Sequence, residues 1–195
     1  MIKKYIKNIN QHYNETISKY GFNIKGLGWR KGGLNKRYEI MTNSYNFENK
    51  SILDYGCGLC NFYKYLIERK IKIKKYTGVE INPKIKRYIL GKFKNKFNVY
   101  ERLPKKKYDI IVSNGVHNYK TTNSEKIFYK DINNLLKITK KALIISFISD
   151  NVDYKENYLS YKNLFKTIKF IQKKKFAFVI NQTMNKYETF LTILK

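Results

Sequence analysis

One short segment, residues 51–62 with the sequence SILDYGCGLCNF, constrains the fold of this chain more than any other. An apolar, strand-like run in it ends at Asp54. Two glycines, Gly56 and Gly58, follow one residue apart, and a helical pattern begins at Phe62. Glycine can adopt a positive φ and lets a ligand approach bare backbone, while the first N–H groups of a helix are unpaired. The segment therefore predicts a strand, a tight turn and a helix start that could together bind a nucleotide-like cofactor.

The acidic residues around this turn favour an adenosine over a pyrophosphate as the ligand. A dinucleotide fingerprint needs a third glycine three residues after the second, where this chain has Asn61. Asp54 instead precedes the glycines, and a second acid, Glu80, closes the strand-like run 76–79. A carboxylate at the tip of a parallel strand can accept hydrogen bonds from both hydroxyls of a ribose.

Three segments, LDYGCGLC, YTGVEINP and YDIIVSNG, occur in this order and resemble motifs I, II and IV of class I (Rossmann-like) S-adenosylmethionine-dependent methyltransferases. The resemblance covers roughly residues 51–195 and implies methyl transfer from S-adenosylmethionine, which leaves S-adenosylhomocysteine. Cys60 stands where the family usually has a third glycine, which bears on cofactor affinity more than on cofactor identity. The segment GLGWRKGGLNKRYEI at 26–40 is also similar to one in small bacterial and phage methyltransferases.

Length and composition predict one domain in the cytoplasm. A chain of 195 residues can bury most of its apolar surface without help. Two cysteines, no apolar run near membrane-spanning length and no signal-peptide pattern argue against a secreted or membrane protein. We expect residues 1–49 to form an N-terminal helical cap with a glycine-rich loop, and residues 50–195 to form the cofactor-binding core. Composition predicts no particular oligomeric state.

The net charge of +27 invites a nucleic-acid interpretation, because lysines neutralise phosphates and release counterions. The basic residues are 36 lysines and only 5 arginines, alongside many Asn, Ile, Tyr and Phe residues that share AT-rich codons. Arginine is the better reader of bases and phosphates, so this composition indicates genome bias more than a specific partner. We expect weak, nonspecific nucleic-acid binding, and specific RNA binding stays open as an alternative.

Apolar periodicity predicts alternating helices and strands. The expected fold class is α/β: a Rossmann-like three-layer sandwich with a seven-stranded, mostly parallel sheet, a C-terminal antiparallel hairpin strand and the helical cap. Helices are expected over 3–20, 37–47, 62–70, from Pro83, 124–138 and 159–172, with a loop over 21–36. Strands are expected from residue 51 and over 76–82, 97–100, 108–113, 142–147, 176–181 and 188–194.

Ligands of an open parallel sheet bind beyond the carboxyl ends of its strands, so we look there for cofactor contacts. By resemblance, Asp54 orders the glycine loop or reaches the methionine amino group, Glu80 binds the ribose and Ile81 lies against the adenine. Glu101 accepts a hydrogen bond from the adenine amino group or is only an exposed loop acid. The other predicted cofactor residues are Gly56, Cys57 and Gly58 of the glycine loop, Ser113 and Asn114 after the fourth strand, and Trp29 and Arg37.

Trp29 and Arg37 belong to a glycine-rich segment of the kind that often folds over a site, and either could line the cofactor or the acceptor pocket. Trp29 could equally pack the first helix onto the sheet. Cys57 and Cys60 form a C-x-x-C pair, but two thiols cannot complete a four-ligand zinc site, and no metal is expected.

Methyl transfer from a sulfonium needs mainly orientation and desolvation, with a general base where the acceptor is a hydroxyl or an ammonium. His117 is the first candidate base, because the usual pKa of histidine lies near neutrality, and Tyr119 and Asp150 follow it. A lone loop histidine is more often only a hydrogen-bonding or surface group.

Two absent patterns narrow the acceptor. Methyltransferases of exocyclic base nitrogens share an Asn/Asp-Pro-Pro-aromatic motif at the fourth strand, where this chain reads SNGV. The Lys-Asp-Lys-Glu tetrad of ribose 2′-O methyltransferases would place its Asp near Asn114. A pocket closed only by the short segment before residue 51 suits a small ligand better than a folded RNA, so we expect an O or N atom of a small molecule, such as a sugar, glycan precursor or metabolite. The alternatives are an RNA methyltransferase that docks through its lysines, and a cofactor-binding subunit without catalysis.

Overall fold

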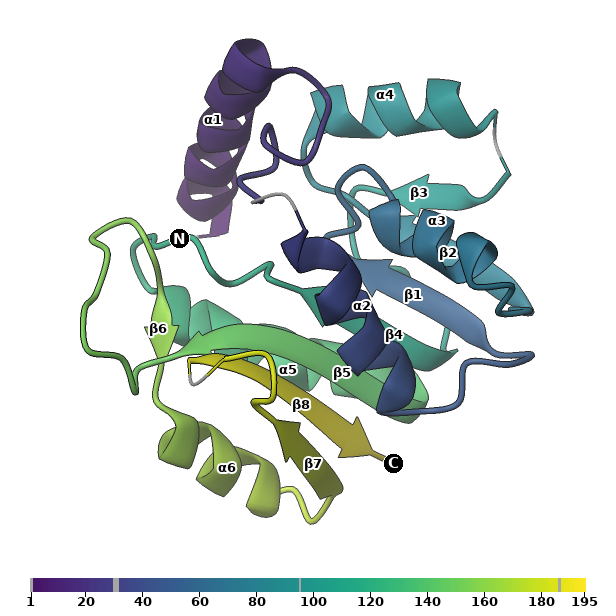
Figure 1. Cartoon of the computed structure of the whole chain (residues 1–195). Helices are drawn as coiled ribbons and strands as arrows, with labels where there is room; N and C mark the ends of the chain where they lie inside the picture. The colour runs from purple at the N-terminus through teal and green to yellow at the C-terminus, as the bar shows by residue number, and fades with distance from the viewer. Residues whose placement is uncertain (1, 30–31, 95, 186) are drawn as a thin grey trace.

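The computed structural model describes residues 2–29, 32–94, 96–185 and 187–195, with side chains from residue 5, and contains a central sheet with helices on both faces (Figure 1). The helices are α1 (Ile2–Tyr20), α2 (Gly33–Asn43), α3 (Asn61–Glu68), α4 (Pro83–Phe93), α5 (Ser124–Ile138) and α6 (Leu164–Gln172). The strands are β1 (Ser51–Tyr55), β2 (Lys75–Val79), β3 (Asn98–Tyr100), β4 (Tyr108–Asn114), β5 (Thr139–Ser149), β6 (Tyr161–Lys162), β7 (Ala177–Asn181) and β8 (Glu188–Leu194).

The strand order in the sheet is β3-β2-β1-β4-β5-β8-β7, and the two-residue β6 pairs with β5 off this path. The first five strands of the path run parallel, whereas β8 is antiparallel to both β5 and β7. The predicted Rossmann-like sheet with a terminal hairpin is therefore confirmed, and β6 is an addition to the seven strands expected. The order reverses between β1 and β4, which is where open sheets of this type bind ligands.

Capping residues explain where several helices begin. Pro83 starts α4 as predicted, and the Asn82 side chain accepts hydrogen bonds from the next two free N–H groups of the helix. Helix α6 begins at Leu164 instead of residue 159, because Asn163 caps it and the residues before it pair with the end of β5. Helix α2 covers 33–43 instead of 37–47. Residues 30–31 of the predicted loop lie outside the described residues.

Side chains that alternate along each strand reach opposite faces of the sheet. Ile52, Val112 and Ile144 pack in the cluster that includes α2, α3 and α4. Their strand neighbours Leu53 and Ile111 pack in the cluster formed with α5 and α6. Both faces are thus apolar and covered, which explains the continuous apolar runs of β4 and β5. The same alternation decides which residues at the strand ends can face a common ligand.

Helix α1 lies above the sheet in Figure 1. It forms hydrogen bonds with the turn between β2 and α4 and with the loop that follows α1. Asn82 Nδ2 donates a hydrogen bond to Asn14 Oδ1 of α1 at 3.1 Å, and Thr16 Oγ1 donates to the carbonyl oxygen of Gly26 at 2.7 Å. Among the described residues, no helix combines the length and the apolar character that crossing a membrane requires.

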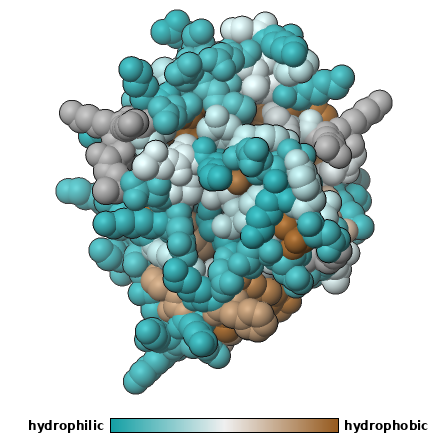
Figure 2. Space-filling model, turned by 90° about the vertical axis from the view of Figure 1, so that its left-hand side faces the viewer, coloured by the Kyte–Doolittle hydropathy of each residue, from teal (hydrophilic) through white to brown (hydrophobic). Residues whose placement is uncertain are grey.

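Hydrophilic residues cover most of the face shown in Figure 2, and an apolar area lies at the bottom of that view, on the side of α6. Phe165 of α6 is 74% exposed, the largest exposed fraction among the large apolar residues described.

Candidate active site

The glycine loop after β1 has the conformation that its sequence predicts. Gly56 and Gly58 have φ values of 76° and 50°, in the left-handed region. The N–H groups of Gly56 and Cys57 donate to the carbonyl oxygen of Val79 at 2.8 and 3.0 Å, which fixes the turn against β2. A Cβ atom on Gly56 would lie 2.3 Å from Cγ2 of Val116, so the close approach of the two loops also requires glycine here.

Cys60 stands where the methyltransferases that this chain resembles have a third glycine. It also adopts the left-handed conformation, with φ 55° at the N-cap of α3. Its thiol is fully buried and accepts or donates a hydrogen bond with Cys57, whose pKa this bond and burial raise well above the usual value. The Cys57 thiol is therefore protonated and not a reactive thiolate, and both cysteines are buried packing groups.

Glu80 joins the glycine loop to the turn before α4. Its Oε2 accepts the N–H of Gly58 at 3.0 Å, and its Oε1 accepts the N–H of Asn82 at 2.7 Å. The carboxylate is buried, and burial raises its pKa to about 7 against the opposing effect of these N–H groups. The carboxylate has about four acceptor positions, so backbone N–H groups do not occupy all of them and Glu80 can still accept a hydrogen bond from a ligand hydroxyl.

Asp54 supplies a second buried carboxylate beside the first. It accepts a short hydrogen bond from the hydroxyl of Tyr76, and burial raises its pKa to about 7, with a smaller contribution from Glu80. Because their pKa values are raised, the two carboxylates hold their protons more strongly than usual when no ligand is present. A bound cation would favour the ionised form of both, because an opposite charge favours the charged form. The pair therefore suits a ligand that carries hydroxyls and positive charge.

A cavity of about 40 Å³ lies between the glycine loop, the end of β4 and the N-terminal segments. Six of the predicted residues line it together: Trp29, Asp54, Gly56, Cys57, Gly58 and Asn114. Leu27, Tyr38 and Met41 line it as well, and the sequence analysis did not single them out. The similarity of segment 26–40 to small methyltransferases was the one signal for Leu27 and Tyr38, and Met41 follows that segment directly.

Trp29 lines this cavity, and Arg37 contacts the Trp29 ring. The Arg37 guanidinium carbon is 4.7 Å from the centroid of the Trp29 ring. Arg37 Nε donates to Glu188 Oε1 at 3.1 Å, and its Nη2 forms a second, shorter bond to Oε2 of the same carboxylate. Trp29 thus lines the cavity, whereas Arg37 is engaged with Trp29 and with β8.

Ser113 and Asn114, which were predicted to line the cofactor together, point to opposite faces of the sheet. Asn114 lines the cavity, and its Oδ1 accepts a hydrogen bond from Ser146 Oγ at 2.8 Å. Ser113 is fully buried on the α5 side, where its hydroxyl has no hydrogen-bond partner among the described residues. The prediction for Ser113 conflicts with the alternation of strand side chains, which the sequence already contained.

Ile81 and Glu101 lie farther along the same edge of the sheet. Ile81 is partly buried directly after Glu80. Glu101 has a side chain that is 59% exposed and that pairs with Lys86 of α4 at 2.9 Å. Glu101 is therefore exposed and paired in this structure, and its bond to the adenine amino group stays a prediction.

His117 lies on the α5 side of the sheet, away from the glycine loop. It is 4% exposed, its ring contacts Phe128 edge-on at 5.2 Å, and its Nε2 is 3.7 Å from Asp131 Oδ2. Burial, with help from the charge of Lys162, lowers its pKa to about 3. The imidazole is therefore neutral near pH 7, and it is enclosed by protein.

The other two candidate bases have different neighbours. The Tyr119 ring stacks on His12 of α1 with ring centroids 4.1 Å apart. Asp150 Oδ2 accepts a hydrogen bond from Asn163 Nδ2 at 2.8 Å, at the connection between β5 and β6. The sequence-predicted bases thus belong to three separate environments, and Tyr119 is the one that lies under the cap.

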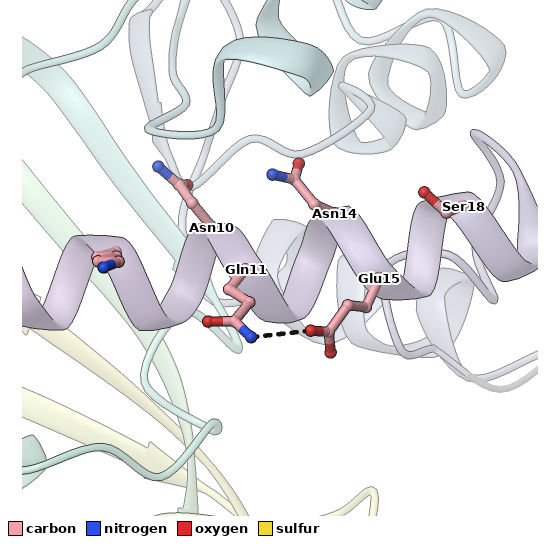
Figure 3. Close-up of a pocket in the computed structure, with 6 residues that line it drawn as sticks. Asn10, Gln11, Asn14, Glu15 and Ser18 are labelled. Atoms are coloured by element: carbon pink, nitrogen blue, oxygen red, sulfur yellow. Dashed lines mark hydrogen bonds between the residues drawn. The ribbon is translucent and has the colours of Figure 1, made fainter.

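A wider hollow of about 520 Å³ runs along one face of α1 and is lined by Lys7, Asn10, Gln11, Asn14, Glu15 and Ser18. Figure 3 shows Gln11 and Glu15 on one side of the helix, joined by a hydrogen bond of 3.0 Å, with Asn10 and Asn14 on another. One helix supplies every lining group, so no groups converge on a ligand there. The small cavity at the glycine loop is the better candidate site.

Within the described part of the chain, no group of three His, Cys, Asp or Glu side chains could hold a metal ion.

The chain matches one protein-family model over most of its length. The sequence model of a family described as "Methyltransferase domain" matches residues 34–174. No curated protein sequence matches the chain.

Many solved structures share the fold. An O-methyltransferase family protein from Burkholderia thailandensis has a TM-score of 0.64 at 10% identity, covering 82% of this chain and 55% of that one. A chain of the Pnkp1/Rnl/Hen1 RNA repair complex has a TM-score of 0.65 at 12% identity, covering 85% and 42%. The DhpI–SAH complex has a TM-score of 0.66 at 6% identity, covering 99% of this chain and 96% of that one. The chain thus spans about half the length of the first two.

Proposed function

Because this chain belongs to the methyltransferase domain family, we propose that it transfers a methyl group from S-adenosylmethionine to an oxygen or nitrogen atom of a small molecule. The observation that carries this proposal is the small enclosed cavity at the switch point of the sheet, between the glycine loop, Asn114 and the N-terminal segments. Asp54 lines this cavity, and Glu80 lies behind it, bonded to the N–H of Gly58 in the lining.

The residues present fit S-adenosylmethionine, which supplies an electrophilic methyl group on a sulfonium. Glu80 would hold the ribose through its remaining acceptor capacity, and Asp54 would face the ammonium of the methionine part, directly or through water. The bare backbone of Gly56 and Gly58 allows close approach, and the free N–H groups at the start of α3 add favourable dipoles.

The acceptor would lie at the end of β4, under Trp29. A Cβ on Gly115 would lie 2.5 Å from Cη2 of Trp29, so the indole rests on bare backbone there. The Asn118 side chain is beside the same glycine, and its Oδ1 is buried without a hydrogen-bond partner among the described residues. An acceptor hydroxyl or amine could donate to this oxygen. The indole would exclude water, so this chain would act mainly through orientation and desolvation.

Two features favour the alternative of an RNA methyltransferase. The net charge of +27 would attract a polyanion, and two of the structural neighbours belong to Hen1 proteins, one of them in an RNA repair complex. The cavity lies under the short N-terminal segments, and this placement favours the small acceptor. A cofactor-binding subunit without catalysis is the third candidate, and tight cofactor binding without turnover would identify it.

The test is transfer of label from methyl-labelled S-adenosylmethionine into fractionated cell extract, with and without nuclease. We expect label in small molecules or glycans that survives nuclease. Nuclease-sensitive label in the macromolecular fraction would contradict the small acceptor and support RNA. The Glu80→Ala variant is the control: at subsaturating S-adenosylmethionine, label that comes from this site should fall in it, because the variant binds the cofactor more weakly.

Salt separates the first two candidates independently. A polyanionic acceptor should lose affinity by orders of magnitude between about 50 and 200 mM salt, whereas a small neutral acceptor should not. A steep slope of log KM for the purified acceptor against log salt concentration would contradict the small-molecule proposal.

A further inference from the structure

We infer that the N-terminal cap is closed by a latch, and that this latch must open before S-adenosylmethionine can bind and S-adenosylhomocysteine can leave. The latch consists of Trp29, Arg37 and Glu188. The inference rests on the cofactor assigned above and not on the identity of the acceptor.

The cavity itself requires a moving part. Its volume of about 40 Å³ holds only a few water molecules, since one needs about 10–15 Å³ on this scale. An adenosine linked to a methionine is many times larger. The groups that would hold it, Glu80 and the glycine loop, are already in place and tied to the sheet. The space must therefore come from displacement of the segments that cover the loop.

The covering side chains come from the segment before α2 and touch both loops of the site. Leu27 Cδ1 lies 2.9 Å from the position of a Cβ on Gly58, and the Trp29 ring lies 2.5 Å from that of a Cβ on Gly115. At these two points the cap and the loops are in direct contact, and a side chain in place of either glycine would have to displace the cap. Leu27 and Trp29 therefore occupy the region above the cofactor loop and the acceptor end of β4.

Arg37 and Glu188 hold Trp29 in this position. The guanidinium stacks on the indole on one side and forms a two-bond fork with the Glu188 carboxylate. The Glu188 side chain is 3% exposed and that of Arg37 is 12% exposed. A planar fork fixes direction as well as distance. Glu188 begins β8, which is paired on both sides within the sheet, so the latch anchors the cap to a rigid element.

The other contacts of α1 with the sheet edge are between neutral groups. Asn82 Nδ2 donates to Asn14 Oδ1 of α1 at 3.1 Å, and the His12 ring of α1 stacks on Tyr119 with ring centroids 4.1 Å apart. Tyr13 of α1 lies near Glu80, since burial and then the charge of Glu80 raise the pKa of its hydroxyl to about 12. The Arg37–Glu188 fork is the charged contact between cap and sheet among the described residues, so it is the contact that we assign as the latch.

The wild-type chain provides its own probe, because Trp29 is its only tryptophan. We would mix it with S-adenosylhomocysteine in a stopped-flow fluorimeter and follow tryptophan emission over a wide range of ligand concentration. A latch that must open first predicts that the observed rate levels off at high ligand concentration. A rate that keeps rising linearly would overturn the inference. So would calorimetrically verified binding without any change in Trp29 emission.

The matched variants are Glu188→Gln, which breaks the buried fork, and Glu125→Gln, which breaks the exposed Lys166–Glu125 pair of 2.7 Å. We expect Glu188→Gln to release S-adenosylhomocysteine at least about fivefold faster and to raise the limiting rate, as loss of one hydrogen bond would do. Glu125→Gln should match the wild type. Release from folded Glu188→Gln within twofold of the wild-type rate would overturn the latch.

Should Glu188→Gln fail to fold, Arg37→Lys tests the same contact, because lysine keeps the charge and loses both the fork and the stacking. All these measurements use S-adenosylhomocysteine alone. A failed search for an acceptor would therefore leave the latch standing, and a latch that fails would leave the proposed methyl transfer standing.

Discussion

In the cofactor half of the site, the key contact joins Glu80 to Gly58, which are 22 residues apart in the sequence. In the cap half, the key contact joins Arg37 to Glu188, which are 151 residues apart. The first contact is made between a side chain and backbone within one β-α-β unit, so local sequence nearly determines it. The second exists only once the whole sheet has formed. The two halves should therefore respond differently to mutation.

Glu188→Ala should have the largest effect, and on stability. It leaves the Arg37 guanidinium in a nearly buried position without its counter-charge, which costs about 3–5 kcal/mol for buried pairs. Urea unfolding followed by circular dichroism measures the loss. Glu125→Gln, at an exposed pair, should lose less than about 1 kcal/mol. Equal losses in the two variants would mean that the cap does not depend on the long-range contact.

Glu80→Ala should act on the cofactor half instead. Loss of the charged hydrogen bonds to the ribose should weaken S-adenosylhomocysteine binding by about 1–3 kcal/mol. The N–H groups of Gly58 and Asn82 also lose their acceptor, which loosens the glycine loop. Isothermal titration calorimetry gives the affinity. An unchanged dissociation constant would remove the ribose assignment.

The same difference between the halves explains what the sequence could predict. The strand, the glycine turn, the start of α4 at Pro83 and the position of Glu80 follow from neighbours in the sequence, and the structure has them. The shift of α6 from 159 to Leu164 depends on the pairing of β6 with β5, which no local pattern reveals. The sequence likewise offered no reason to pair Arg37 with Glu188.

Ser113 and His117 show a second limit. The position of β4 was predicted correctly, with Ser113 inside the strand and His117 shortly after it. The roles of these two residues, however, were assigned from their place in a sequence motif. Alternation along the strand places Ser113 on the α5 side, and the turn after Gly115 takes His117 to the same side. Strand periodicity could have excluded Ser113 in advance. The path of the loop that buries His117 against Phe128 could not be derived in the same way.

The pKa values of the paired acids predict a pH effect confined to the cofactor half. Burial raises the pKa of both Asp54 and Glu80 to about 7, so the empty site takes up protons as pH falls through 7. A ligand that needs the ionised acids competes with these protons. Affinity for S-adenosylhomocysteine should therefore fall on acidification from pH 8 to 6, by up to about tenfold per unit below 7 for each acid that must ionise.

Calorimetry in buffers of different ionisation enthalpy checks this, because binding at pH 6 should release protons. Affinity that is constant from pH 8 to 6, with no proton release, would show that the two acids are ionised in the empty site. The Glu80→Ala variant should have a shallower pH dependence than the wild type, since only Asp54 then remains to titrate.

His117→Gln should have the smallest effect on transfer. The imidazole is enclosed by Phe128 and Asp131 on the α5 side, and burial holds its pKa near 3, so it does not change protonation between pH 5 and 8. At saturating S-adenosylmethionine, the rate should stay within about twofold of the wild type and keep the same pH profile, because the group does not titrate in the working range. The comparison becomes possible once an acceptor is in hand. An acidic limb near pH 6–7 that disappears in His117→Gln would restore the histidine as the base. That result would also require the loop after β4 to turn the ring toward the cavity, so that the acceptor half of the site would form only with its ligands bound.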